Sequence, residues 1–274
     1  MNILVTNDDG INAPGLWHLA EAMQAVGNVF IVAPDREQTG VGPSLSLAKA
    51  IRMHKLPYSM EGSPAWTVEG TPGDAVILAL AHISKDVPVD LVVSGVNNGA
   101  NTGSNVFISG TVGAAWHALL RGVPSIAISC QYRMPSAGDL LYAIGSRMAA
   151  LIARSIFDRS LPPDVLYNLN VPYCRPEELT GMLATRTGME RFADEVREED
   201  DGRGRLLYHL LFRRERVDRT KGTEAWALAH NYLALTLLNS RLSPAPRKLL
   251  PPDFCERSFR ELMAAEQPLV ATGL

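Results

Sequence analysis

The chain has 274 residues, of which 46% are hydrophobic and 20% are charged, and its formal net charge is −3. These values are typical of a globular protein with a sizeable core, and they exclude a collagen-like or intrinsically disordered chain. The small acidic excess gives no general attraction for polyanions, so we expect neither a nucleic-acid polymer nor a membrane as partner.

Strands and helices alternate along the first part of the chain. Short β-branched and apolar runs predict strands over residues 3–6, 29–33, 90–95, 124–129 and 165–171. Apolar residues at helical spacing predict helices over residues 16–26, 73–84, 111–120 and 140–157. This alternation predicts an α/β fold with a mostly parallel sheet.

The pattern changes after Pro172. A charged β-hairpin is predicted over residues 195–216, and the apolar segment 226–238 fits either a strand or a helix. A proline-rich segment then leads into a short amphipathic helix predicted over residues 256–265. We therefore divide the chain into a core, residues 1–180, and a hairpin with a carboxyl-terminal arm, residues 181–274.

Charge is unevenly distributed along these elements. Residues 91–130 contain one charged side chain, Arg121, whereas 18 of the 32 residues from 190 to 221 are charged. The first segment is expected to be buried. The second is expected to project from the body and to pair its charges across a subunit boundary.

The three cysteines lie far apart and form no Cys-x-x-Cys pair. This spacing argues against a disulfide framework and against a structural zinc site. We find no basic segment followed by an apolar run at the start of the chain, and no window approaching the roughly 18 apolar residues of a membrane span. A cytoplasmic location is therefore expected.

Two adjacent carboxylates, Asp8 and Asp9, follow the first predicted strand. The carboxyl ends of parallel strands are where α/β sheets bind ligands. Adjacent acids repel each other unless a cation or a proton lies between them, and oxygen donors without His or Cys favour Mg²⁺, Mn²⁺ or Ca²⁺ over zinc. The alternative is a plain turn and helix cap, because Asp and Gly are common turn residues.

A glycine- and asparagine-rich segment, residues 94–113, follows the third predicted parallel strand. It ends at Ser109-Gly110-Thr111, where a predicted helix begins and free N–H groups can bind an anion. A metal that faces an anion site is typical of phosphoryl hydrolysis. The alternative is a glycine-rich surface loop.

Together these motifs resemble those of the SurE (survival protein E) family, metal-dependent nucleoside monophosphate phosphatases. The resemblance extends over about residues 1–172 and rests on segments 3–10, 33–40, 70–74, 90–101, 109–115 and 168–172. It implies a Rossmann-like, three-layer fold with a projecting hairpin and a carboxyl-terminal extension. It also implies a homodimer or homotetramer, built through the 190–221 hairpin and the carboxyl-terminal arm.

The resemblance also implies one Mn²⁺ or Mg²⁺ per subunit. The implied metal ligands are Asp8, Asp9, Thr39 and Asn97. The implied phosphate-binding residues are Asn7, Gly40, Asn101, Ser109, Gly110 and Thr111. The chain departs from the family pattern in two places: Thr39 replaces the usual Ser, and in segment 222–238 Glu224 replaces the usual Asp and the usual Gly, Ser and Pro are absent.

The resemblance implies hydrolysis of nucleoside 5′-monophosphates, and also of 3′-monophosphates. The residues themselves predict that the reaction uses metal-activated water, with Asp8 or Asp9 as catalytic base. The resemblance adds exopolyphosphatase as a side activity. Two alternatives stay open. One is an aspartyl-phosphate phosphatase, although its two acids are normally separated by one residue. The other is a nucleotide-binding protein that has lost turnover.

Overall fold

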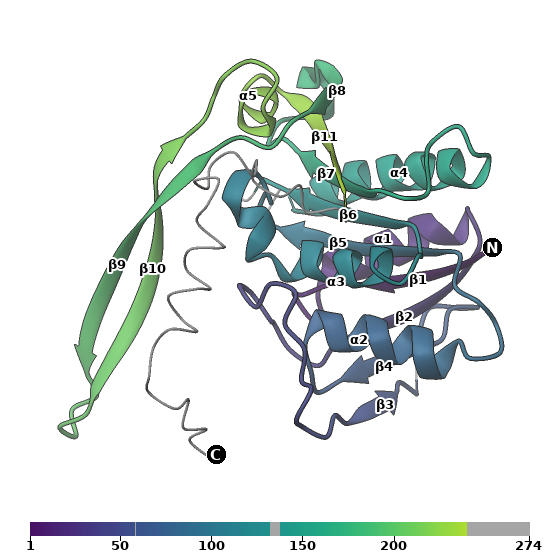
Figure 1. Ribbon diagram of the computed structural model, residues 1–274, viewed down its shortest axis with the longest axis horizontal. Helices are drawn as coiled ribbons and strands as arrows, with labels where there is room; N and C mark the ends of the chain where they lie inside the picture. Colours follow the sequence, from purple (N-terminus) through teal and green to yellow (C-terminus); the bar gives the residue numbers. More distant parts are fainter. Residues whose placement is uncertain (58, 132–137, 240–274) are drawn as a thin grey trace, which may run out of the picture. The chain divides into compact units, whose positions relative to one another are not determined.

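The structure is a computed structural model that describes residues 1–57, 59–131 and 138–239 (Figure 1). Nine strands form one sheet in the order β3-β4-β2-β1-β5-β6-β7-β11-β8. These strands are β1 (Asn2–Thr6), β2 (Asn28–Pro34), β3 (Met53–Lys55), β4 (Ala65–Val68), β5 (Leu91–Asn98), β6 (Ser125–Cys130), β7 (Leu166–Val171), β8 (Gly181–Thr185) and β11 (Tyr232–Leu238). Within this described sheet, only the β3–β4 and β7–β11 pairs are antiparallel. The predicted α/β fold with a mostly parallel sheet is confirmed.

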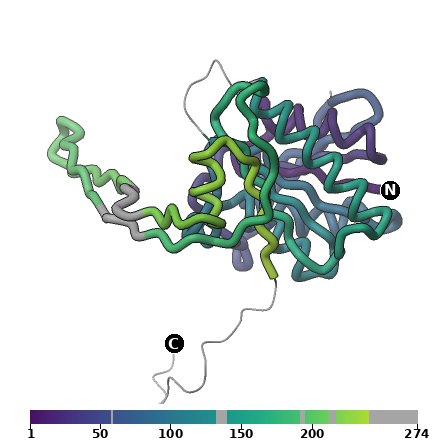
Figure 2. The backbone as a smooth tube through the Cα atoms, turned by 90° about the horizontal axis from the view of Figure 1, so that it is seen from above, coloured from purple at the N-terminus to yellow at the C-terminus, as the bar shows by residue number. Residues whose placement is uncertain are grey.

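Helices cover both faces of this sheet (Figures 1 and 2). They are α1 (Pro14–Gln24), α2 (Pro72–Leu78), α3 (Gly110–Leu119), α4 (Gly138–Phe157) and α5 (Glu224–Ala229), with short helices η1 (Ala79–Ile83), η2 (Gly103–Phe107) and η4 (Pro176–Glu178). Ile3 and Val5 of β1 belong to the core cluster that contains α1 and α4, whereas Leu4 belongs to the one that contains α2 and α3. A strand buried on both faces is mostly apolar, which explains the apolar run Ile3-Leu4-Val5 in β1.

Helix α4 is long and apolar enough, by length and composition only, to cross a membrane between Leu140 and Phe157. In this structure it covers the sheet instead. Tyr142, Ala149 and Ile152 are buried in the same core cluster as α1 and the central strands. Its apolar face is therefore satisfied by the protein core.

The hairpin consists of β9 (Glu190–Asp200) and β10 (Leu206–Val217), which pair with each other in a separate two-stranded sheet. Figure 2 shows it extending away from the nine-stranded sheet. Some of its charges pair within the hairpin: Arg205 lies 2.7 Å from Asp201, and His209 lies 2.9 Å from Glu199. The hairpin begins five residues before its predicted start.

Three strands, β3, β4 and β8, have no counterpart in the prediction. Segment 226–238, predicted as either a strand or a helix, contains the end of helix α5 and all of strand β11. Because β8 and β11 join the sheet of the core, that sheet continues past residue 180, the predicted limit of the core. The predicted helix over residues 256–265 and the rest of the carboxyl-terminal arm beyond residue 239 lie outside the described residues.

Candidate active site

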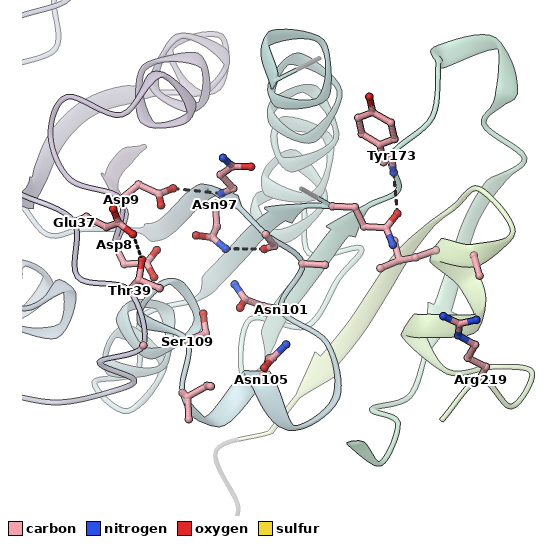
Figure 3. A pocket seen from close by; sticks show the side chains of 18 residues that line it. Asp8, Asp9, Glu37, Thr39, Asn97, Asn101, Asn105, Ser109, Tyr173 and Arg219 are labelled. Carbon is pink, nitrogen blue, oxygen red and sulfur yellow. Dashed lines mark hydrogen bonds between the residues drawn. The ribbon is translucent and has the colours of Figure 1, made fainter. Parts of the chain in front are cut away.

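A cavity of about 1010 Å³ opens where β1, β2 and β5 end (Figure 3). One side is lined by Asp8, Asp9, Glu37, Thr39, Gly40 and Asn97. The loop after β5 and the start of α3 contribute Asn98, Gly99, Ala100, Asn101, Asn105, Ile108 and Ser109. The opposite side is formed by Gln131, Tyr173, Arg219, Leu228 and Ala229. All four predicted metal ligands therefore line one cavity.

Asp8 is almost completely buried, with 4% of its surface exposed. Its Oδ1 accepts a hydrogen bond from the Thr111 hydroxyl at the start of α3. A Cβ atom at Gly110 would lie 2.7 Å from the Asp8 Cβ, so only glycine allows the helix to approach the acid this closely. Burial raises the pKa of Asp8, and the hydrogen bonds from Thr111 oppose that rise.

Asp9 is half-buried beside Asp8, and its Oδ2 accepts a hydrogen bond from the Asn98 backbone N–H at 3.3 Å. Burial, followed by the negative charge of Asp8, raises the pKa of Asp9 to about 7. Glu37 adds a smaller effect in the same direction for both acids. Ionised Asp8 and Asp9 are therefore unfavourable at this end of the cavity. A bound cation would stabilise their ionised forms.

The donor atoms around the two acids suit a hard cation. The Asn97 amide group donates to the Gly99 carbonyl at 2.6 Å, which leaves its own carbonyl oxygen available as a ligand. The Gln38 N–H donates to the Asp8 carbonyl at 2.7 Å and so holds the loop that carries Thr39, whose hydroxyl donates to Glu37. No cluster of three or more His, Cys, Asp or Glu side chains with metal-binding geometry occurs among the described residues. A metal here would depend on amide and hydroxyl oxygens in addition to the two carboxylates.

The predicted phosphate-binding residues divide into two groups. Gly40, Asn101 and Ser109 line the cavity. Asn7, Gly110 and Thr111 do not line it and are buried close behind it. The Asn7 amide group donates to the Gly10 carbonyl at 2.9 Å, where it closes the turn that presents the two acids.

Two asparagines of β7 fix the loop that carries Asn101. The Asn101 N–H donates to Asn170 Oδ1 at 2.8 Å, and its carbonyl accepts from Asn168 at 2.9 Å and Asn170 at 3.1 Å. Ser109 caps α3 by accepting a hydrogen bond from the Val112 N–H at 3.1 Å. The first turn of α3 therefore starts beside the acids, and Ser109 is the residue of that turn that lines the cavity.

Sequence reasoning missed the side of the cavity opposite the acids. Its members are far apart in the chain: Gln131 follows β6, Tyr173 follows β7, and Arg219 follows the hairpin. Arg36, three residues before Thr39 in the chain, does not line the cavity. Its side chain is 75% exposed and lies 3.9 Å from Asp35. Among the described lining residues, Arg219 is the only arginine, lysine or histidine.

The model of the family described as "Survival protein SurE" matches residues 3–194. The chain belongs to the SurE family. It is 40% identical over 247 residues to a protein of Dehalococcoides mccartyi (strain CBDB1) named 5′-nucleotidase SurE, with 90% of this chain and 91% of the relative covered. It is also 40% identical over 238 residues to 5′-nucleotidase SurE 1 of Thermus thermophilus, covering 86% of this chain and 90% of that relative.

The crystal structure of the SurE protein from Aquifex aeolicus has the same fold as this chain. Its TM-score is 0.73 at 30% sequence identity, and the superposition covers 96% of this chain and 100% of that one. The family resemblance drawn from the motifs is therefore confirmed. The roles of individual residues in binding a metal or a phosphate stay predictions.

Proposed function

We propose that this chain is a metal-dependent 5′-nucleotidase, a phosphomonoesterase that converts nucleoside 5′-monophosphates, and also 3′-monophosphates, to nucleoside and phosphate. The observation that carries the proposal is the pair of adjacent acids at the end of β1, which line one cavity together with Thr39, Asn97 and Ser109 at the start of α3. The names of the relatives, 5′-nucleotidases, support the substrate class. Exopolyphosphatase activity remains a prediction from the family resemblance.

Asp8, Asp9, Thr39 and Asn97 would hold one Mn²⁺ or Mg²⁺. When bound, such an ion supplies charge neutralisation for the phosphate and lowers the pKa of water. These four residues fit a divalent cation because they offer oxygen donors and include two carboxyl groups whose pKa values are raised by burial. The Thr111 hydroxyl, by donating to Asp8 Oδ1, fixes the direction in which the other oxygen of that carboxylate points.

The other side chains have separate tasks in the proposed reaction. Asp8 or Asp9, both of which line the cavity, would accept the proton of the attacking water. The Ser109 side chain, which lines the cavity at the start of α3, would donate to a phosphate oxygen. Asn101, held in place by β7, would position the phosphate from the opposite side.

Chelation tests the proposal directly. The protein should release phosphate from adenosine 5′-monophosphate in the presence of Mn²⁺, lose that activity in EDTA, and recover it when Mn²⁺ is added in excess. Turnover that survives chelation would contradict a metal-dependent mechanism. Trapping of a covalent phosphate on Asp8 would favour an aspartyl-phosphate enzyme, and tight nucleotide binding without phosphate release would favour a binding protein.

We also propose that the hairpin builds a homodimer or homotetramer. Val196, Tyr208 and Leu210 expose 56%, 61% and 72% of their surfaces, which is unusual for apolar side chains on a paired strand. Deleting residues 197–214 should lower the molecular mass measured by light scattering to that of a smaller assembly. An unchanged subunit number would show that the hairpin is a solvated projection.

A cytoplasmic location is proposed on the cysteine content. Cys130 and Cys174 are free thiols, and Cys130 is buried in the core. Burial raises the pKa of the Cys130 thiol, which keeps it protonated and unreactive. Both observations agree with a reducing compartment.

A further inference from the structure

Arg219 stands on the side of the cavity away from the acids. Figure 3 shows Asp8, Asp9 and Thr39 together on one side, Asn101 and Asn105 between, and Arg219 on the other. Arg219 makes no hydrogen bond or ion pair with any other residue that the structure describes. An arginine that lines a cavity and has no partner there is available to a ligand.

The backbone on both sides of Arg219 is fixed. The Thr220 N–H donates to Asp218 Oδ1 at 2.9 Å, and the Thr223 hydroxyl contacts the Asp218 carbonyl at 3.0 Å and the Thr220 carbonyl at 2.9 Å. Asp218 is also 3.7 Å from Arg186. These contacts place the Arg219 Cα at a defined point of the cavity rim, so its side chain does not depend on a loose loop for its position.

The cavity is larger than a phosphate group needs. Its volume, about 1010 Å³, lies at the upper end of the roughly 300–1,000 Å³ found for small-molecule sites. A phosphate held between the acids and α3 would fill only the near side. The group attached to that phosphate must then extend toward Arg219, with Leu228 and Ala229 of the α5 region as its apolar surroundings.

We infer that Arg219 contacts the nucleobase of the leaving nucleoside and contributes to substrate specificity. The inference rests on the proposed function, because it is the nucleotidase reaction that places a nucleoside in this part of the cavity. A guanidinium group is planar, stacks on aromatic rings and donates hydrogen bonds to ring nitrogens and carbonyl oxygens. Leu228 and Ala229 line the same cavity and add apolar lining that suits a flat ring better than a second phosphate.

Adenosine binding measures this contact without any turnover. We expect Arg219→Ala to weaken the affinity for adenosine, measured by calorimetry, about tenfold, the size of effect of one hydrogen bond from a charged group. Arg219→Lys keeps the charge and loses the planar guanidinium, so its affinity for adenosine should lie between those of wild type and Arg219→Ala. Arg52→Ala is the matched control: Arg52 lies far along the chain, 3.4 Å from Glu69, and does not line the cavity.

Steady-state kinetics separates the base from the phosphate. Arg219→Ala should raise KM for adenosine 5′-monophosphate about tenfold with little change in kcat. The same variant should raise KM for ribose 5-phosphate, which has no base, less than about twofold. An equal rise for both substrates would show that Arg219 meets the phosphate, and that result would overturn the inference.

The calorimetric result also distinguishes failure of this inference from failure of the proposed function. If nucleotides are not hydrolysed with Mn²⁺ but adenosine still binds in an Arg219-dependent manner, the proposed reaction is wrong and the base contact stands. If nucleotides are hydrolysed while adenosine binds wild type and Arg219→Ala equally, or binds neither, the base contact is wrong. Circular dichroism should show that all three variants fold like wild type, because Arg219 and Arg52 are exposed.

Discussion

Asp8→Asn should lower phosphate release from adenosine 5′-monophosphate by about a thousandfold or more, the scale of losing one preorganised charged group from a phosphoryl-transfer site. The substitution keeps an oxygen that can accept from Thr111, so the position of α3 is preserved. What it removes is the negative charge needed to hold a divalent cation. Initial rates at saturating Mn²⁺ measure the effect.

The stability of the same variant makes the prediction specific. Burial disfavours the ionised form of Asp8, so the neutral amide should not lower the thermal unfolding temperature of the metal-free protein. Asp86→Asn is a matched control, because it removes the same charge from an exposed position outside the cavity. Retention of more than about a tenth of wild-type activity by Asp8→Asn would remove Asp8 from the proposed mechanism.

Glu224→Ala should destabilise the fold by about 3 kcal/mol, the typical scale for breaking a buried charged hydrogen-bond cluster. Glu224 is fully buried and accepts from the Gly103 N–H at 3.2 Å, the Gly188 N–H at 3.1 Å and the Thr236 hydroxyl at 3.2 Å. Truncation removes the acceptor of the Gly103 and Gly188 N–H groups and one of the two partners of the Thr236 hydroxyl, which also contacts the Thr185 hydroxyl at 2.7 Å. Urea unfolding measures the loss, and Glu69→Ala, on the exposed surface, should change stability by less than about 1 kcal/mol.

The Glu224→Gln variant gives this prediction a pH dependence. Burial is the main cause that raises the pKa of Glu224, and the charge of Glu190 adds to it. At pH values above the ordinary glutamate pKa, the folded state therefore binds more protons than the unfolded state, so the free energy of unfolding falls as pH rises. The stability that Glu224 contributes is complete at acidic pH and is lost as pH rises through the raised pKa. The free energy of unfolding of wild type, relative to that of Glu224→Gln, should therefore be highest at acidic pH and should fall as pH rises. A difference that grows with pH would contradict a raised pKa.

Much of the fold was predictable because the central strands are buried on both faces. Ile3, Leu4 and Val5 read as a strand from the sequence, since a strand covered on both sides is mostly apolar. The edge strands gave no such signal. His54 and Lys55 of β3 are exposed, as is Met182 of β8, so neither alternation nor an apolar run marked these segments as strands.

The acid side of the cavity was predictable for a different reason. Asp8, Asp9, Thr39 and Asn97 each follow a parallel strand or lie at its end, and the carboxyl ends of parallel strands meet at one edge of the sheet. No such rule places Arg219, which reaches the cavity through contacts between distant segments. In the sequence it is one of 18 charged residues in a 32-residue segment, and nothing in that composition distinguishes it from its neighbours.

β11 is the last strand that the structure describes, yet it lies inside the sheet, between β7 and β8. β8 pairs with no other strand in the described part of the chain, so it cannot join the sheet until residue 238 has left the ribosome. The two acids follow β1, and β1 can pair with β2 and β5 as soon as the first 98 residues are available. During synthesis, the acid half of the cavity is therefore expected to form well before the half that contains Arg219, and a truncated chain would present the acids without the wall that faces them.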